Sequence, residues 1–427
     1  MIVNNLPVTG KRYVSGRIAV TKENSMHVAT ADSILDSSKE AADQLWEQLS
    51  ARLGGSPDWI IVAPSVSYDI SQLQQTLINH GAKRFHGSTS CLGAMTERGV
   101  VNAEGRGIAA FGIVDPDGHY GVGEATLDAA ASPEAATCQA LDAALNDAGR
   151  PGEVPDLIWI SAPPGCEERV ISEIETSLGA GVPIVGGSSA DNDVSGQWAQ
   201  LTQVGVYRDA IVVSVLFPST ELCFAFHSGY EPTEIKGRVT RADGRILYEI
   251  DGRPAAEVYN DWTGGVLQDA FASGEQNVLP LTTLYPLGRV VGSVGGTAYH
   301  QLSHPDQITP ERGLSLFADV AVGDEFWLMK GTRDSLIERA GRVARAAMRT
   351  GDVAPGDIAG GLVIYCAGCM LTVQDQMDNV VGHLNDALEG RPFLGSFTFG
   401  EQGCFIGGEN RHGNLMISVL LLGNTPV

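Results

Sequence analysis

Three cysteines and one histidine near the C-terminus have the residue types and spacing for thiol or metal chemistry. Cys366 and Cys369 form a Cys-x-x-Cys motif, and Cys404 and His412 follow it along the chain. Such a motif lowers a thiol pKa and suits redox chemistry or metal binding. Three thiolates and one imidazole also match a tetrahedral zinc site, although no second Cys-x-x-Cys is present. Other interpretations stay open: a Cys366 nucleophile with His412 as its base, thiols that line a ligand pocket, or thiols that only pack in a core.

The stretch from Gly400 to Asn414, GEQGCFIGGENRHGN, is dense in polar side chains. Loops rich in polar residues and glycine are common binding elements. In the alternative interpretation, asparagine and glycine serve only the backbone geometry of a hairpin. We favour binding, and the candidate ligand contacts are Glu401, Asn410, His412 and Asn414.

Two further stretches place small polar side chains after a Gly-Ser pair. They are GGSSADND (Gly186–Asp193) and GSTSC (Gly87–Cys91). Glycines followed by hydroxyl and carboxylate groups can cradle a ligand amine or another polar head. The glycines alone are weak evidence, because no dinucleotide or P-loop fingerprint is present. The candidate contacts here are Ser88, Cys91, Gly187, Ser188, Asp191 and Asn192.

One pattern, written three times, must position all of these residues. In each copy an apolar strand-like run is followed by a helix-length stretch, a Gly-Ser pair on a second run, and a third apolar run. The first runs are Asp58–Ser65, Asp156–Pro164 and Gly361–Cys369. The Gly-Ser segments are His86–Ser90, Gly186–Asp191 and Leu394–Glu401, and the third runs are Gly107–Val114, Asp209–Phe217 and Asn414–Gly423. The repetition predicts three diverged copies of one unit.

A helix is expected before each copy, over Ser38–Gly55, Ser132–Gly149 and Arg333–Gly351. Helical spacing of apolar residues and a terminal glycine support this expectation. A short β-like run precedes each helix, at Gly16–Asn24, His119–Leu127 and Asp324–Thr332. The predicted fold is therefore α/β or α+β layered. Mixed sheets covered by helices are built from three β-α-β-α-β-β units of ~100 residues each.

One region does not follow the repeat. Residues Ser219–Gly323 read as a β-rich insert with a hairpin-like DG turn. We therefore predict an N-terminal domain over Met1–Pro218 with two units and a C-terminal domain over Ser219–Val427. The third unit would occupy 324–427.

The third copy departs from the other two in its chemistry. Cys366 occupies the position held by Ala63 and Ser161 in the other copies. Ligands of open α/β sheets bind beyond the carboxyl ends of the strands. The loops after the first runs and the turns after the Gly-Ser pairs are thus expected to form the site, above all in the third copy.

Composition excludes several classes of function. The formal net charge of −23 opposes binding to nucleic acid or to an anionic membrane, which both rest on Lys and Arg contacts with phosphate. No apolar run is long enough for a spanning helix, and the N-terminus does not resemble a secretory signal. Seven cysteines without a signal point to reduced thiols and a cytoplasmic location.

Several stretches resemble the FIST family of prokaryotic sensory modules, which have an N-terminal and a C-terminal FIST domain. The matching stretches are VPIVGGSSADND, VTRADGRILYEIDGRPAAEVY, YCAGCMLTVQDQMD, PFLGSFTFGEQG and GENRHGNLMISV. The resemblance implies a sensor of small ligands such as amino acids. Some members are similar to a haem-containing nitric-oxide sensor that acts on a partner histidine kinase. The chain leaves no room for a kinase or cyclase, so the resemblance implies a separate signalling partner.

Noncovalent haem is a further expectation that follows from this resemblance. Covalent attachment is not expected, because Met370 and not histidine follows the Cys-x-x-Cys motif. The axial candidates are His300, His304, His383 and His412. The leading hypothesis is a cytoplasmic sensor without a catalytic fingerprint that binds its ligand between the two halves of the chain. The alternatives are a cysteine-dependent enzyme and a metal-stabilised interaction protein, and the sequence leaves a homo-oligomer open.

Overall fold

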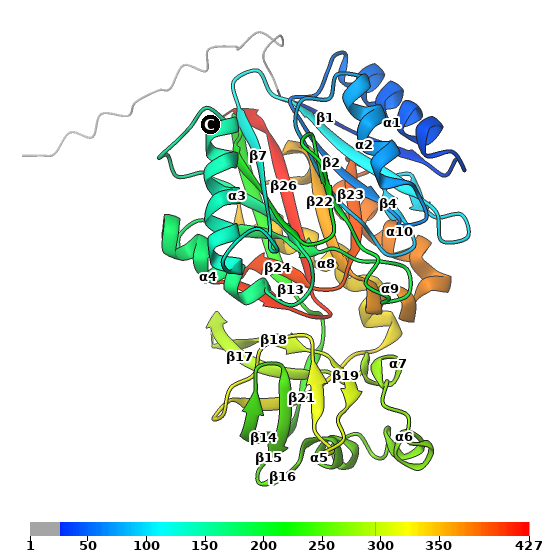
Figure 1. The fold of residues 1–427 in the computed structure, drawn as a ribbon, viewed down its shortest axis with the longest axis vertical. Helices are drawn as coiled ribbons and strands as arrows, with labels where there is room; N and C mark the ends of the chain where they lie inside the picture. The colour runs from blue at the N-terminus through cyan, green and yellow to red at the C-terminus, as the bar shows by residue number, and fades with distance from the viewer. Residues whose placement is uncertain (1–25, 295, 427) are drawn as a thin grey trace, which may run out of the picture.

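Three repeat units and an insert build the protein (Figure 1). The computed structural model describes residues 26–294 and 296–426. Within them the strands form three sheets of six strands and one sheet of eight. Each six-stranded sheet contains the strands of one unit together with a hairpin from another unit, and the eight-stranded sheet belongs to the insert. The mixed, helix-covered architecture predicted from the repeat is confirmed.

The first unit begins at β1, and the strand expected at Gly16–Asn24 lies outside the described residues. The Ser37 side chain accepts a hydrogen bond from Glu40 N to start α1, and Gly54 ends the helix in the left-handed conformation. Helix α2 connects the parallel strands β2 and β3, as a crossover requires. The elements are β1 (His27–Ser33), α1 (Ser38–Leu53), β2 (Trp59–Pro64), α2 (Ile70–Asn79), β3 (Phe85–Ser88), β4 (Ala94–Thr96), β5 (Gly99–Val101) and β6 (Ile108–Val114).

The second unit follows the same order. Its first strand and first helix match the expected His119–Leu127 and Ser132–Gly149 closely. Strands β8 and β9 are parallel, and α4 connects them. The elements are β7 (His119–Thr126), α3 (Pro133–Asp147), β8 (Leu157–Ala162), α4 (Glu167–Leu178), β9 (Ile184–Ser188), β10 (Gln200–Thr202), β11 (Val206–Tyr207) and β12 (Ala210–Phe217).

Replacing Ser132 by alanine is expected to destabilise the protein by about 1 kcal/mol, because an N-cap oxygen is lost. Ser132 Oγ accepts from Ala135 N at 3.2 Å, and Pro133 opens the helix. Urea denaturation of both proteins measures the difference. Ser132→Asp retains a capping oxygen and is expected to keep the wild-type stability. Equal losses of stability in Ser132→Ala and Ser132→Asp would show that the lost N-cap hydrogen bond is not what destabilises the protein.

The third unit starts at a different strand from the one predicted. We expected Asp324–Thr332, but β21 (Glu325–Lys330) lies in the sheet of the insert. Strand β13 (Thr220–His227) takes the first place and pairs antiparallel with the last strand, β26. The other elements are α8 (Arg333–Thr350), η2 (Pro355–Asp357), β22 (Ile358–Cys366), α9 (Ala367–Thr372), η3 (Gln374–Gln376), α10 (Met377–Leu388), β23 (Phe393–Thr398), β24 (Glu401–Cys404), β25 (Asn410–Gly413) and β26 (Ile417–Pro426).

The insert lies between β13 and α8 and has its own core, below the three sheets in Figure 1. Its core includes Val239, Leu247, Leu314 and Phe326. The elements are β14 (Glu231–Asp243), β15 (Ile246–Ile250), β16 (Arg253–Pro254), α5 (Ala255–Trp262), α6 (Gln268–Ser273), α7 (Leu279–Thr282), β17 (Leu287–Val294), β18 (Thr297–Ser303), β19 (Pro305–Ile308), β20 (Leu314–Leu316) and β21. The β-rich sheet therefore starts at β14. The domain division after Pro218 stays a prediction.

Each unit gives a hairpin to the sheet of another unit. The hairpin β4–β5 pairs with β23, β10–β11 pairs with β3, and β24–β25 pairs with β9. The exchange is cyclic, so that each six-stranded sheet has the same order: first strand, last strand, central strand, Gly-Ser strand and a borrowed hairpin. These hairpins, which precede the last strand of each unit, thus cover edges that would otherwise expose unpaired backbone groups.

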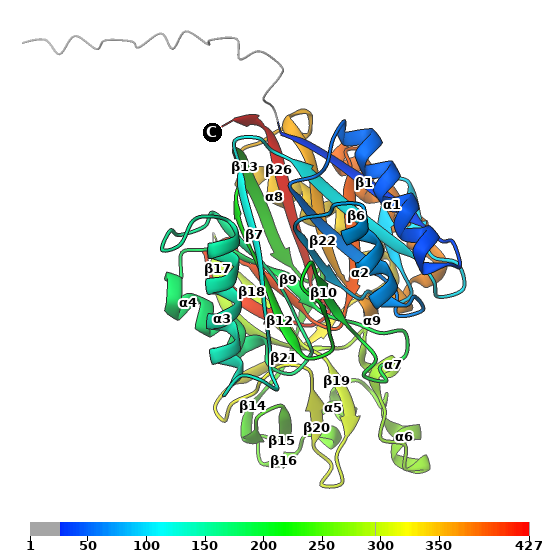
Figure 2. The same ribbon diagram turned by 45° about the horizontal axis from the view of Figure 1, so that its top comes forward.

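The three sheets share one core and are covered outside by helices. A buried cluster joins residues of all three central strands, including Trp59, Trp159 and Leu362. The outer faces pack against α1 and α2, against α3 and α4, and against α8 to α10. Figure 2 shows the first two helix pairs on opposite sides of the body. This arrangement explains why the first run of each copy is almost wholly apolar.

Candidate functional site

The hairpin β24–β25 brings two predicted binding segments together, because β24 pairs with the Gly-Ser strand β9 of the second unit. The Gln402 amide nitrogen lies 3.2 Å from Ser188 Oγ and 3.2 Å from His412 Nδ1. His412 Nε2 lies 3.1 Å from the Phe317 carbonyl oxygen in the insert. A buried polar network therefore connects the second unit, the third unit and the insert.

A buried glutamate extends this network to the start of α4. Glu167 is 2% exposed, and its carboxylate accepts hydrogen bonds from Ser188 Oγ and Arg245 Nη2, each at 2.7 Å. Arg245, in the turn between β14 and β15, also donates to Glu168 at 2.6 Å. Burial alone would raise the pKa of Glu167, but His412 and the Arg245 guanidinium outweigh it and lower this pKa to about 2. Glu167 is thus a buried carboxylate that holds the insert against α4.

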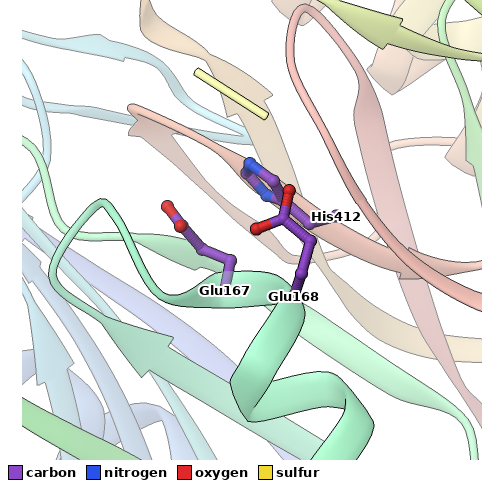
Figure 3. Close-up of side chains that lie close together, drawn as sticks. All are labelled: Glu167, Glu168 and His412. Carbon is purple, nitrogen blue, oxygen red and sulfur yellow. The ribbon is translucent and has the colours of Figure 1, made fainter. Parts of the chain in front are cut away.

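Three side chains of the network have the types and proximity of metal ligands (Figure 3). Glu167, Glu168 and His412 each place a ligand atom within 4.8 Å of the others, and no further group of this kind was found among the described residues. The Arg245 guanidinium donates to both carboxylates, so a cation already neutralises them. The arrangement is therefore better described as an ion-pair network than as a metal centre.

A cleft of about 600 Å³ opens beside the network, and we call it the α4–insert cleft. Its walls come from α4, from the insert and from β25. Groups of both charges line it, and its polar walls include Glu168, Glu175, Arg289, Gln301, Asp324, Asn410, Arg411 and His412. The predicted contacts Asn410 and His412 therefore reach one cleft, together with charged residues that the sequence did not single out.

Two of these charged groups are loosely held. Within the described chain Glu175 forms no ion pair, and its carboxylate accepts a hydrogen bond from Asn410 Nδ2 at 3.0 Å. Arg411 Nη1 donates to the Asn410 carbonyl at 2.9 Å, its Nη2 lies 3.5 Å from the Glu409 carboxylate, and its side chain is 39% exposed. Arg289, in contrast, is paired with Asp324. Glu175 and Arg411 thus each keep hydrogen-bonding capacity for a further partner.

Equivalent clefts occur at the equivalent places of the other units. One of about 640 Å³ lies between the segment 66–71, after β2, and the segment 192–208, which carries β10 and β11. A smaller one of about 120 Å³ lies between the α9–α10 region and the β4–β5 region. Each cleft is lined in part by the segment that follows a central strand along the chain.

Two asparagines of the predicted binding turn hold backbone groups. Asn410 Oδ1 accepts from Ile184 N at 2.8 Å, and its Nδ2 donates to Val182 O at 3.0 Å. Asn414 Oδ1 accepts from His304 N at 3.3 Å, while its Nδ2 is buried without a partner in the described structure. Asn410 therefore anchors the hairpin at the cleft wall, and Asn414 anchors the insert.

Asp191 and Asn192 have comparable local roles. The buried Asp191 carboxylate accepts from Val194 N at 2.5 Å and from Gln197 N at 2.7 Å, which closes its own loop. Asn192 Oδ1 accepts from Leu92 N at 2.8 Å and thereby ties the second unit to the first. Asn192 also lines the 640 Å³ cleft, whereas Asp191 shapes the loop that carries it.

Ser88 and Gly187 lie where the three units meet. They line a central cavity of about 10 Å³ with Ser396 of the third unit, which is room for about one water molecule. A side chain at Gly187 would meet Thr398 Cγ2 at 2.5 Å, so glycine is required for the close approach. Cys91 is buried nearby in the chain, and burial raises its pKa to about 12. These residues pack the centre and not the α4–insert cleft.

The structure does not bring together the four predicted zinc ligands. Cys366 ends β22, and Cys369 in α9 lies 3.5 Å from Tyr230 Oη. Cys404 Sγ lies 3.6 Å from the Phe405 carbonyl. His412 belongs to the polar network described above, so Cys366 and His412 do not form a nucleophile–base pair.

Glu401 turns away from the cleft. Its carboxylate accepts from Thr398 Oγ1 and Met416 N, each at 3.0 Å, and it is fully buried. Burial raises the pKa of this carboxyl well above its ordinary value. Glu401 is therefore an internal carboxyl group of the third unit, in a place that disfavours its charged form.

The other histidines considered for haem lie on separate elements. His304 is buried beside Thr283, and burial lowers its pKa to about 3. His300 contacts the Trp327 ring edge-on, with the ring centroids 5.8 Å apart. His383 lines a different cleft on α10. Of the four candidates, His412 is the one at the α4–insert cleft.

Sequence reasoning missed the acidic start of α4 and the arginine that neutralises it. Glu167 and Glu168 come shortly after the apolar run Asp156–Pro164. Acidic residues at this place suit a helix N-terminus, and this pattern was the available signal. No comparable sequence signal pointed to Arg245, because it is 78 residues from Glu167 and lies in the turn of a hairpin.

Two family models match this arrangement of repeated mixed sheets. A model of the FIST N domain matches residues 18–253, and a model of the FIST C domain matches residues 255–404. The chain therefore belongs to the FIST family, as the sequence resemblance indicated. FIST domains are small-ligand sensory domains. The described helices include none with the length and apolar character to cross a bilayer.

The individual relatives are either distant in sequence or aligned over a short stretch. The uncharacterized protein MJ1623 of Methanocaldococcus jannaschii is 37% identical over 78 residues, which are 18% of this chain and 15% of that protein. Two cyanuric acid hydrolase structures, one of them from A. caulinodans, are 10% identical and cover 93% of this chain, with TM-scores of 0.33 and 0.37. They are covered over 100% and 99% of their own lengths. PurLQS from Thermotoga maritima is 12% identical, with a TM-score of 0.22 and coverage of 94% and 73%.

Proposed function

We propose that this protein is a cytoplasmic sensor that binds a zwitterionic small molecule, such as an amino acid, in the α4–insert cleft. The observation that carries the proposal is the lining of this cleft, where groups of both charges face a space of about 600 Å³. A cleft of this size suits a small molecule. That all seven cysteines are free thiols supports the cytoplasmic location.

The two loosely held charges supply complementary contacts. The Glu175 carboxylate would accept from the ligand ammonium group, and the Arg411 guanidinium would donate to the ligand carboxylate. An arginine fork matches a carboxylate in two parallel hydrogen bonds, which favours arginine over lysine in this role. Both residues line the cleft from different units, so that the ligand would bridge them.

A signalling mechanism is suggested by the three parts of the chain that form the walls of the α4–insert cleft. The second unit, the third unit and the insert all contribute, and a ligand that contacts all three favours one arrangement of them over others. The changed surface would then be read by a separate partner such as a histidine kinase.

Substituting Glu175 or Arg411 by glutamine is expected to weaken amino acid binding at least about tenfold, because each variant removes one charge-assisted contact. Isothermal titration with a panel of amino acids measures the affinity. Arg208→Gln is the matched control, because Arg208 lines the equivalent 640 Å³ cleft. If Arg208→Gln weakened binding and Arg411→Gln did not, the ligand would bind in the wrong cleft for this proposal.

Haem is the other ligand that the family resemblance implied. The charged lining favours a zwitterion, since a porphyrin buries two apolar faces. An absorption spectrum of protein purified with haem supplied decides between them. We expect no Soret band, and a Soret band that shifts on addition of nitric oxide would overturn the choice of ligand.

A further inference from the structure

A fully buried arginine stands beside the two thiols of the Cys-x-x-Cys motif. Arg339 of α8 is 0% exposed, and its Nη1 donates to the carbonyls of Ser228 and Leu415, each at 2.7 Å. Its Nε and Nη2 are buried and have no hydrogen-bond partner in the described structure. No carboxylate of the described residues lies within ion-pair distance of it. A buried charge left in this state is costly, so a counter-charge is required.

The surrounding groups leave one candidate for that counter-charge. The rings of Tyr230 and Tyr365 have their centroids 5.8 and 4.9 Å from the guanidinium carbon, and these cation–π contacts bring no formal negative charge. Burial raises the pKa of the nearby Glu401 carboxyl well above its ordinary value, which disfavours a charge there. Burial alone would also raise the pKa of Cys369, but Cys366 and the Arg339 charge outweigh it and lower this pKa. Cys369 is therefore the group beside Arg339 in which a negative charge is favoured.

The two sulfurs are placed for a bond to each other. Cys366 is the N-cap of α9, and Cys369 is the third residue of that helix. An N-cap residue and the third residue of its helix bring their side chains together, as in a capping box, and a small local adjustment would bring the two sulfurs to disulfide distance. In the described structure both are free thiols.

We propose that Cys366 and Cys369 form a redox-active dithiol, which hydrogen peroxide or another hydroperoxide converts into a disulfide. The Cys369 thiolate attacks one peroxide oxygen, the O–O bond breaks, and the leaving hydroxide takes a proton to become water. The Cys366 sulfur then attacks the resulting Cys369 sulfenic acid, the S–O bond breaks, and a second water leaves as the S–S bond forms. The two thiols lose two protons and two electrons in total, and the peroxide takes them up to give two water molecules.

The position of the dithiol gives the oxidation a structural consequence. The segment Ser228–Tyr230 joins β13 to β14 of the insert, and both Arg339 and Cys369 contact it. Tyr230 Oη also donates to the Thr283 carbonyl in the insert at 2.8 Å. A disulfide removes the negative charge opposite Arg339 at this joint, and the packing of the insert against the third unit is where its effect would be felt.

Peptide mapping by mass spectrometry after peroxide treatment of the full chain tests the proposal. We expect the Cys366–Cys369 peptide to lose two hydrogens and dithiothreitol to restore them. Cys366→Ser should trap Cys369 as a sulfenic acid that dimedone labels, whereas Cys369→Ser should leave Cys366 unlabelled. Cys404→Ser is the matched control and should form the disulfide at the wild-type rate, because burial raises the pKa of Cys404 to about 12.

The role of Arg339 is tested by comparing a variant that keeps its positive charge with one that removes it. Arg339→Lys should retain the wild-type oxidation rate within about threefold, and Arg339→Met should slow it about tenfold or more, because thiolate character falls. If the methionine variant does not fold, the two serine variants still decide the order of attack. No Cys366–Cys369 disulfide in the wild-type chain, or equal dimedone labelling of both serine variants, would overturn the proposal.

Discussion

Substitution of Glu167 by glutamine is expected to lower the free energy of unfolding by about 3 kcal/mol at neutral pH. The folded-state pKa of Glu167 is about 2, against an ordinary value of 4.5, and each pKa unit corresponds to about 1.4 kcal/mol. The residue is almost fully buried, so solvent screening reduces this figure little. The variant also leaves one bond of Arg245 unmatched, while Glu168 and Asp319 continue to hold that guanidinium.

The same substitution has a defined pH dependence. The folded-state pKa of Glu167 is depressed, so its stabilisation is complete above about pH 4.5 and is lost as the pH falls toward 2. Urea denaturation of wild type and variant at pH 7, 4 and 3 should show the difference shrinking with acid. Glu153→Gln is the control, since the Arg150–Glu153 pair is exposed and should contribute less than about 1 kcal/mol. A difference that did not shrink would show that shape, not charge, stabilises this position.

Substitution of Gly341 by alanine is expected to destabilise the protein by about 3 kcal/mol, because the helices α8 and α10 pack through this glycine. A Cβ atom at Gly341 would lie 2.4 Å from the His383 carbonyl oxygen and 2.9 Å from its carbon. Both atoms are backbone of α10, so relief requires the helices to move apart. Differential scanning calorimetry measures the lowered melting temperature.

Gly382 of α10 provides the matched control for this prediction. It is also a glycine inside a helix, but no atom lies within 4 Å of the position a Cβ would take. Gly382→Ala should therefore raise the stability by about 0.5–1 kcal/mol, through the lower conformational entropy of the unfolded chain. If Gly341→Ala were as well tolerated as Gly382→Ala, the close contact of the two helices would be refuted.

The elements that local sequence controls were predicted well. Helix α3 begins at the Ser132 cap, and the crossovers join parallel strands in all three units. The prediction of the first strand of the third unit was wrong, because the insert separates β13 from α8 along the chain. Both β13 and β21 have strand-like patterns, and only the pairing of β13 with β26 decides between them.

The candidate site was predicted in part. The polar turn does reach a cleft, through Asn410 and His412. Its partners on α4 and in the insert were missed, because they meet only when the insert folds against the second unit. Cys366 and Cys369 stood out from the other repeats by type alone, whereas the buried Arg339 that gives them their electrostatic setting could not be placed from its helix.

The sequence by itself determined three copies of a helix-covered unit, because capping residues, apolar periodicity and Gly-Ser strands act over short distances along the chain. The tertiary structure decided which sheet receives each hairpin. A strand edge offers the same backbone donors and acceptors to any partner strand, so the local pattern does not name the partner. The placement of β24 and β25 on β9 therefore decided which side chains line the α4–insert cleft.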